Sequence, residues 1–141
     1  MTEADLPVAL MSELLSADQT MKSVIAKHLP RGLELSHFSV LNHLSAGGER
    51  SPAQLARSFQ VTKGAMTNTL RRLNDAGFVH IRPDWDDSRK KMVSISPAGR
   101  QMRDYALQML APVFDQVRQD MEPERLRDAL RLLRAFRAAL T

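Results

Sequence analysis

The sequence predicts a mainly α-helical fold with one short β-hairpin, and two patterns support that prediction. Apolar residues recur every three or four positions through most of the chain, as in helices with one buried face. Residues 79–95 differ, because two runs of alternating apolar and polar residues flank a charged ten-residue turn from Arg82 to Lys91. A hairpin this small is not stable alone, so we expect it to pack against neighbouring helices.

Length and composition limit the classes of protein to consider. A chain of 141 residues forms one domain, or one domain with an added dimerisation element. It contains no cysteine, which excludes disulfides and thiolate metal sites. The N-terminus has Glu3 and Asp5 where a signal peptide has basic residues, and no apolar run reaches the length of a membrane span. We therefore expect a cytoplasmic protein without a membrane partner.

Two helices are predicted in the first third of the chain. The first carries an apolar stripe through Leu10, Leu14, Ala17, Met21 and Ile25, and it ends at Pro30-Arg31-Gly32. The second covers about residues 35–45, turns Phe38, Leu41 and Leu44 inward, and stops at Gly47-Gly48.

Two shorter helices with strong start signals follow. Ser51 can cap a helix over residues 52–59, with Pro52 at its first position and Gln54 completing a capping box. Thr62 can cap the next helix, which runs to about Ala76. On a helical wheel its inward side holds Met66, Leu70 and Leu73. Its outward side and flank are small or polar: Gly64, Ala65, Thr67, Asn68, Arg71, Arg72 and Asp75.

The hairpin comes next, and strand alternation places its side chains on two faces. Val79, Ile81, Val93 and Ile95 share the face expected to be buried, while His80 and Ser94 point the other way. Two short helices followed at once by such a hairpin are the arrangement of a winged helix-turn-helix, in which the hairpin is the wing.

The remaining residues predict two more helices. One begins at Ser96-Pro97 and runs toward Asp120, where Pro112 predicts a kink near residues 108–112 or a break. The last begins at Pro123 and carries a stripe of leucines. The apolar faces at both ends of the chain exceed the core available, which favours a twofold dimer built from the terminal helices. A monomer whose terminal helices fold back on their own chain is the alternative.

The positive charge is concentrated in the middle of the chain. The formal charge is +4 overall, but residues 50–91 hold nine Lys or Arg and four Asp or Glu, a net of +5, and the rest carries −1. Such a segment can bind a phosphate backbone, although a solvated basic face would have the same composition.

Residues 33–100 resemble MarR-type repressors in four pieces that occur in order. Leu33 to Leu41 is similar to the Leu-Thr-x-x-Gln-Phe-x-Val-Leu opening of that family's second helix. The other pieces are Gln54-Leu55-Ala56 with Val61 to Thr67, Arg72 to Val79, and Asp84 to Arg89 with Val93 to Gly99. The sequence departs from the pattern at Glu34, His37, Gly64, Ala65, Asn68 and Trp85, differences that should alter operator preference more than fold.

The resemblance implies a bacterial homodimer that binds double-stranded DNA at an inverted-repeat operator and usually represses. The implied parts are an N-terminal dimerisation helix over residues 1–32, a DNA-binding lobe over 33–96 and C-terminal dimerisation helices over 97–141. Arg89 corresponds to the wing arginine that enters the minor groove, and Asp87 to the acid that positions it by pairing with Arg89 or Arg72. The other expected DNA-binding residues are Ser51, Gln54, Thr62, Lys63, Gly64, Ala65, Thr67, Asn68, Arg71, Arg72, Lys90 and Lys91.

An effector, an enzymatic activity and a protein-binding role are the other possibilities for this chain. Relatives often release DNA on binding a small aromatic or phenolic effector, and His28, His37 and His43 with Met11, Met21, Met102 and Met109 lie on helices that could line such a pocket. Methionines at helical spacing are more often core residues. We expect no cofactor or metal and no enzyme, because no nucleophile–base constellation or phosphate loop is present. A winged helix used for protein contact is the remaining alternative.

Overall fold

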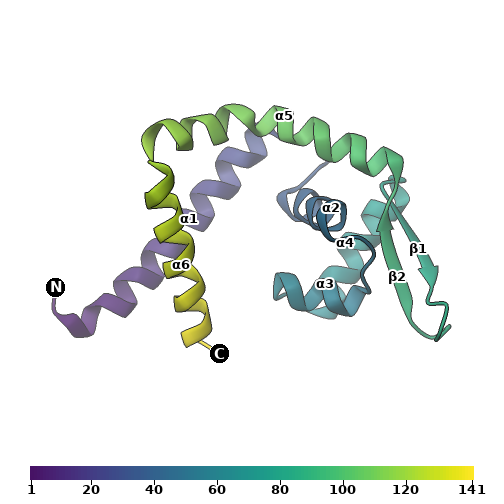
Figure 1. Cartoon of the computed structure of the whole chain (residues 1–141), viewed down its shortest axis with the longest axis horizontal. Coiled ribbons are helices and arrows are strands. Elements are labelled where there is room, and N and C mark those ends of the chain that lie inside the picture. Colours follow the sequence, from purple (N-terminus) through teal and green to yellow (C-terminus); the bar gives the residue numbers. More distant parts are fainter. The chain divides into compact units, whose positions relative to one another are not determined.

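The computed structural model describes residues 1–141 and confirms a mainly helical fold with one hairpin. The elements in order are the 3-10 turn η1 (Glu3–Asp5), α1 (Leu6–His28), α2 (Leu35–Gly47), α3 (Pro52–Phe59), α4 (Lys63–Asp75), β1 (Val79–Pro83), β2 (Lys91–Ile95), α5 (Pro97–Asp120) and α6 (Pro123–Ala139) (Figure 1). They form two compact units, Met1–Met109 and Leu110–Thr141, so the boundary lies within α5.

The core of the first unit lies where α2, α3, α4 and the hairpin meet. Its least accessible side chains are Leu41, Leu44, Leu55, Leu73 and Val93. Helices α3 and α4 pack against each other, and α2 contacts both α4 and β2. The inward residues predicted for α2 and α4 are all buried, because their spacing of three and four places them on one side of each helix.

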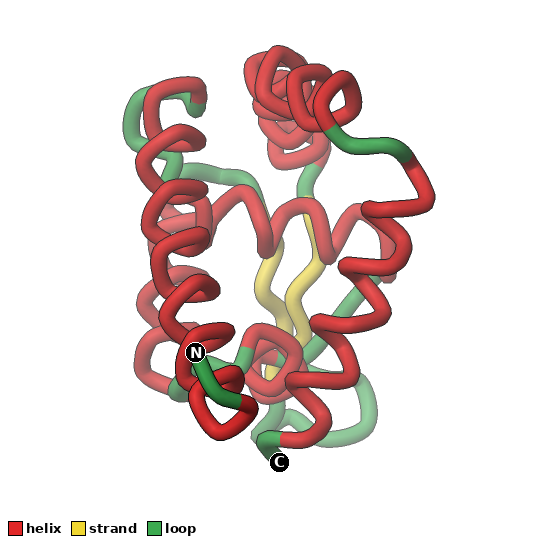
Figure 2. The backbone as a smooth tube through the Cα atoms, turned by 90° about the vertical axis from the view of Figure 1, so that its left-hand side faces the viewer, coloured by secondary structure: helices red, strands yellow, loops and turns green.

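The hairpin is antiparallel, with its two strands running side by side (yellow in Figure 2). Val79 pairs with Ile95, and the pairing continues outward to Pro83 and Lys91. The predicted ten-residue turn is therefore wrong at both ends, and the turn covers residues 84–90 only. The alternation of apolar residues does not mark the outer pairs Arg82–Met92 and Pro83–Lys91, because backbone pairing continues where the side chains no longer alternate between apolar and polar.

The start of α5 packs closely against the hairpin. Gly99 is buried, and a Cβ atom added to it would lie 2.0 Å from the carbonyl oxygen of Phe78. The Ser96 hydroxyl donates to the carbonyl oxygen of Gly77 at 2.6 Å and accepts from the Gly99 amide at 2.9 Å. These contacts join the end of the helix-turn-helix to the helix that leaves the lobe.

The second unit contains the rest of α5 and α6. Helix α5 continues through Pro112, so the break considered for that position does not occur. Helix α6 has no buried residue, and Leu130, Leu132, Leu133 and Leu140 are exposed. The helices of the chain lack the sustained apolar length that a membrane-spanning segment requires.

Candidate nucleic-acid interface

Two capped helices build the helix-turn-helix. The Ser51 hydroxyl accepts a hydrogen bond from the Gln54 amide at 3.1 Å, and the Gln54 side chain accepts from the Ser51 amide at 2.8 Å. Gln60, with a φ of 52°, makes the left-handed turn that ends α3. The Thr62 hydroxyl then accepts from the Ala65 amide at 3.1 Å. Both predicted caps are therefore present, and they fix where α3 and α4 begin.

Ser51 and Gln54 keep hydrogen-bonding capacity despite their capping bonds. In the cap Ser51 uses its oxygen as an acceptor, which leaves its hydroxyl hydrogen free to donate. Gln54 likewise uses its carbonyl oxygen and retains its amide hydrogens. Phosphate oxygens accept such donors, so the two residues can cap α3 and contact a DNA backbone together.

One face of α4 is exposed along its whole length. It carries Lys63 and the residues that the sequence predicted to be outward or flanking: Gly64, Ala65, Thr67, Asn68, Arg71, Arg72 and Asp75. The first turn bears no bulky side chain other than Lys63, and a helix end of this kind can approach base edges closely. Arg71 donates to the side-chain oxygen of Asn68, which leaves the Asn68 amide hydrogens outward as donors.

Arg72 pairs with α2 and not with the wing. Its guanidinium lies 3.5 Å from the Glu34 carboxylate, and both side chains are largely exposed. Arg89 and Arg72 were both considered as ion-pair partners of Asp87, and the structure shows Asp87 paired with Arg89. An exposed pair of this kind contributes about 0–1 kcal/mol, so Arg72 can leave Glu34 for a phosphate at little cost.

His37 is buried beside this pair. Its Nδ1 accepts a hydrogen bond from the Glu34 amide at 3.0 Å, in the position that a glutamine occupies in a capping box. Burial is the main cause of the lowered pKa of His37; the Glu34 carboxylate opposes the shift and the Arg72 guanidinium adds to it. The imidazole is therefore neutral at pH 7 and caps α2 as an acceptor.

A network of hydrogen bonds fixes the wing turn. The Asp84 amide donates to the Lys90 carbonyl and the Lys90 amide to the Asp87 carbonyl, both at 2.9 Å. The Asp87 carboxylate accepts from the Arg89 amide and from the Arg89 Nε, both at 3.1 Å. The Arg89 guanidinium and then the Arg89 amide lower the pKa of Asp87. Arg89 nevertheless has 89% of its side chain exposed.

Sequence reasoning missed a second cluster at the base of the wing. The Nε of Arg82 donates to Glu49 at 3.1 Å, and its Nη2 forms a second bond to the same carboxylate. The guanidinium also lies 4.3 Å from the centroid of the Trp85 ring. Arg82 and Glu49 are 33 residues apart, and no local pattern marks such a pair.

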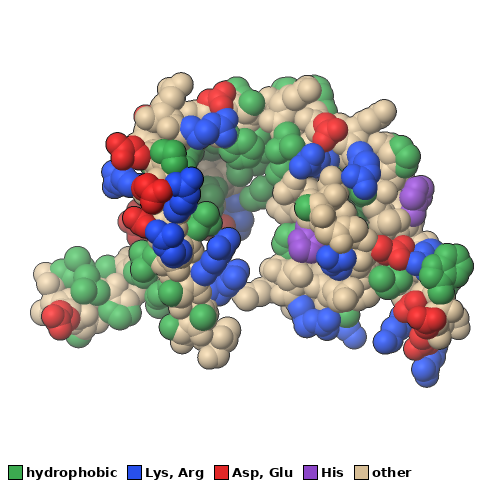
Figure 3. All heavy atoms as spheres, in the orientation of Figure 1, with side chains coloured by type: hydrophobic (Ala, Val, Ile, Leu, Met, Phe, Trp, Pro, Cys, Tyr) green, Lys and Arg blue, Asp and Glu red, His purple; other side chains and the backbone are tan.

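Several basic side chains on α4 and the wing are free of ion pairs. Lys63, Lys90 and Lys91 are exposed and form no ion pair, whereas Arg72, Arg82 and Arg89 are each paired with an acid. Basic and acidic side chains gather together over the tip of the hairpin (Figure 3). The surface is therefore positive without being uniformly so.

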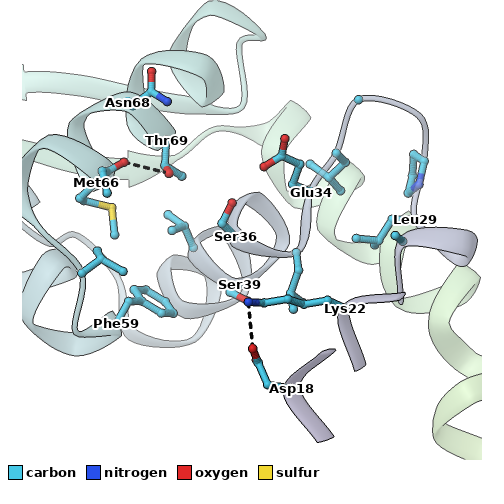
Figure 4. A pocket seen from close by; sticks show the side chains of 18 of the residues that line it. Asp18, Lys22, Leu29, Glu34, Ser36, Ser39, Phe59, Met66, Asn68 and Thr69 are labelled. Atoms are coloured by element: carbon cyan, nitrogen blue, oxygen red, sulfur yellow. Dashed lines mark hydrogen bonds and ion pairs between the residues drawn. The ribbon is translucent and has the colours of Figure 1, made fainter. Parts of the chain in front are cut away.

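A cavity of about 1080 Å³ lies in the first unit beside α4. Figure 4 shows Met66, Asn68 and Thr69 on one side of it and the Asp18–Lys22 ion pair on another. The remaining wall comes from residues 29–36, Ser39, Val40, Phe59 and Val61, with Ala26 and Ala65.

The side chains that sequence analysis considered for a pocket do not line this cavity. His28, His43, Met11, Met21, Met102 and Met109 are absent from its wall, and His37 lines a separate pocket of about 70 Å³. Much of the wall is the connection between α1 and α2, which helical periodicity does not describe. No group of three or more side chains is arranged to hold a metal ion.

Comparison with known proteins supports the same fold. Residues 31–90 match the model of the MarR family. A curated relative, the HTH-type transcriptional repressor Rv2887 of Mycobacterium tuberculosis, is 38% identical over 71 residues, which is 50% of this chain and 51% of that protein. The chain thus spans about half the length of the curated relatives it matches.

Solved structures cover nearly the whole chain. The transcriptional regulator BldR from Sulfolobus solfataricus has a TM-score of 0.84 at 27% identity and covers 96% of this chain and 99% of its own. BpsR from Bordetella bronchiseptica, solved to explain how 6-hydroxynicotinic acid regulates its DNA binding, has a TM-score of 0.78 at 20% identity, covering 88% and 89%. The second likeness shows the fold alone.

Proposed function

We propose that this chain, whose residues 31–90 match the model of the MarR family, is a sequence-specific DNA-binding transcriptional regulator of that family, acting as a repressor in the cytoplasm. The observation that carries the proposal is the exposed face of α4 next to a wing whose Arg89 side chain is 89% exposed. The curated relative that is named a transcriptional repressor supports the same function.

In the proposed complex, α4 enters the major groove. Its first turn brings Thr62, Lys63, Gly64 and Ala65 to the DNA, and Thr67 and Asn68 follow on the same exposed face. The outward amide of Asn68 can donate to a base edge. A bidentate contact to adenine, the pairing this side chain favours, also uses its oxygen, which Arg71 must then share or release. Arg71 and Arg72, further along the helix, are then placed to contact the phosphate backbone at the edge of the major groove.

The wing supplies the second set of contacts. Arg89 enters the minor groove, where a narrow A·T-rich segment concentrates negative potential. Asp87 holds the arginine by the bonds described above, and Lys90 and Lys91 bind phosphates. Ser51 and Gln54 at the start of α3 donate to the backbone between the two grooves.

A homodimer explains the uncovered apolar surface at both ends of the chain. Helix α1 has no buried residue, and five of its large apolar side chains are exposed: Leu6, Val8, Met11, Leu15 and Met21. Helix α6 shows the same property independently. Monomers rarely expose this much apolar surface, and a second copy would cover it while pairing two α4 helices for an inverted repeat.

The cavity beside α4 suits release by a small aromatic or phenolic acid. Phe59, Val61 and Met66 provide apolar walls, and Arg31 provides a positive charge for a carboxylate. The other charged residues of the wall are already paired, Lys22 with Asp18 and Glu34 with Arg72. An occupant would touch α4 itself, and two residues of the cavity wall, Ala65 and Asn68, also belong to the face that is proposed to meet DNA. The study of BpsR gives a precedent for such regulation in a protein of this fold.

Selection from a pool of random duplex DNA tests the proposal. The expected product is an inverted repeat whose half-sites lie about 10 base pairs apart, one turn of the DNA helix. Failure to enrich any sequence, together with weak binding at low salt, would favour a winged helix that contacts proteins. Adding 6-hydroxynicotinic acid and related aromatic acids to the selected complex then tests release.

The Arg89→Ala variant tests the wing. We expect binding to the selected duplex to weaken about tenfold or more, equivalent to about 1.4 kcal/mol, while the dimer stays intact. Arg118→Ala is the matched control, because Arg118 is also an exposed arginine paired with a nearby aspartate but lies outside residues 50–91. Equal affinity of the Arg89 variant and the wild-type protein at fixed salt would refute the role of the wing.

A further inference from the structure

Trp85 is the only tryptophan in the chain, and 84% of it is exposed on the wing turn. Tryptophan side chains normally bury a large area and contribute much to the packing of cores and interfaces. This ring instead stands in water next to the segment that carries Arg89. This exposure shows that Trp85 is not part of the core and is available to contact another molecule.

The ring is held in place by Arg82. The guanidinium lies 4.3 Å from the ring centroid and also donates from Nη1 to the carbonyl oxygen of Pro83 at 2.7 Å. Its Nε and Nη2 bond the Glu49 carboxylate, and both side chains are mostly buried, at 29% and 31% exposed. These bonds use each of the three guanidinium nitrogens, and the Glu49 carboxylate already compensates the charge of Arg82, so we do not assign Arg82 to a phosphate.

The Glu49–Arg82 pair is itself fixed to the body of the lobe. Glu49 precedes Arg50, whose backbone pairs with that of Val93 in β2 through bonds of 3.0 and 2.7 Å. The pair therefore joins the segment before α3 to the outer part of β1. Trp85 lies in a turn, but the Arg82 side chain beneath its ring is fixed by these contacts.

The charges around Trp85 decide which part of DNA it can meet. Asp84 and Asp86 flank it in sequence, and the Asp86 amide is bonded to the Asp84 carboxylate at 3.2 Å. Carboxylates at this point repel phosphate oxygens. The deoxyribose rings are the uncharged, largely apolar part of the groove wall, and an indole face can pack against them. Lys90 and Lys91 across the turn provide the attraction to the backbone as a whole.

We propose that Trp85 is a DNA-contacting residue of the wing, packing its exposed ring against the deoxyribose wall of the groove that Arg89 enters. Arg82 and Glu49 are positioning residues that hold the ring. The inference rests on the proposed function, because it requires that the wing meets DNA. It adds an apolar contact to a wing that otherwise acts through charge.

Intrinsic fluorescence tests the contact directly, because all tryptophan emission comes from Trp85. The full-length protein is titrated with the selected duplex, and quenching by acrylamide is measured with and without DNA. We expect the quenching constant to fall about twofold or more on binding, because packing against sugar removes the ring from water. A ring that stays equally accessible in the specific complex would overturn the proposal.

Affinity and its salt dependence separate this contact from a charged one. Trp85→Ala should weaken binding about tenfold and Trp85→Phe about threefold, with the slope of log affinity against log salt unchanged, because no charge is removed. Arg89→Ala should instead make that slope shallower. Trp85→Ala with wild-type affinity would also overturn the proposal, whereas a wild-type protein that selects no duplex would refute the proposed function itself.

The positioning role of Arg82 has its own readout. Arg82→Lys keeps the charge but loses the planar fork that pairs with Glu49 and stacks on the ring. We expect altered Trp85 emission in the free protein and about threefold weaker DNA binding, with the thermal midpoint measured as a control for folding. Unchanged emission in this variant would show that Arg82 does not hold the ring.

Discussion

Replacing Gly64 with alanine is expected to stabilise the protein and to weaken its binding to DNA. Gly64 lies in the first turn of α4, and a Cβ atom added there would meet nothing within 4 Å. Glycine in a helix costs about 0.5–1 kcal/mol relative to alanine, so the substitution should recover up to that amount. The same methyl group would stand between α4 and the base edges, where the proposed complex needs close approach.

Two measurements on one variant separate the effects. Thermal unfolding at fixed protein concentration should show a midpoint raised by about 2–4 °C, the shift that 1 kcal/mol produces in a protein of this size. Titration of the selected duplex should show weaker binding. An affinity equal to that of the wild-type protein would refute the view that Gly64 is present for approach to DNA.

Gly99→Ala is the matched control, because it makes the same chemical change where space is absent. The new Cβ would lie 2.0 Å from the Phe78 carbonyl oxygen and 2.8 Å from Cγ1 of Ile95. Since the nearest atom belongs to the backbone, the start of α5 must move, at a cost of about 1–3 kcal/mol or more. If both variants changed stability in the same direction, the geometry described for one of the two sites would be wrong.

Three further outcomes are expected. Stability to urea should fall as the pH drops below the ordinary histidine pKa of 6.5, because the unfolded chain then takes up a proton that buried His37 accepts only at lower pH; His37→Gln should flatten this dependence between pH 5 and 7. Leu133→Glu should convert the dimer to a monomer in sedimentation experiments, and a persistent dimer would exclude α6 from the interface. Ser96→Ala should cost about 1–3 kcal/mol in the free energy of unfolding, because it leaves the Gly99 amide without its bond, and a loss of only a few tenths would contradict this.

Local signals in the sequence were sufficient for most of the fold. The bonds that cap α3 and α4 join residues three apart, so Ser51 and Thr62 marked both helix starts correctly. Strand alternation marked the hairpin but not its outer pairs, where a basic residue faces Met92 or Pro83. Apolar periodicity also found the buried faces of α2 and α4.

The interactions that sequence reasoning missed connect distant residues. Glu34 and Arg72 are 38 residues apart, and only the folded lobe brings them together. The Glu49–Arg82 pair has the same origin. Which of two candidate partners Asp87 takes also depended on where Arg72 points, and that direction is set by α2.

The position of Glu34 sets a limit on how strongly a ligand could act through it. Its side chain lies on the wall of the cavity and also pairs with Arg72 on α4, so one carboxylate is shared by two sites. A ligand that bound Glu34 would break an exposed ion pair whose free energy is about 1 kcal/mol at most. Breaking this pair can change the DNA affinity by about fivefold at most. By reciprocity, DNA that captures Arg72 would change ligand affinity by the same factor. Release of DNA by a larger factor would therefore require α4 or the subunits to move as bodies, and the size of the effect alone would distinguish local competition from a change of conformation.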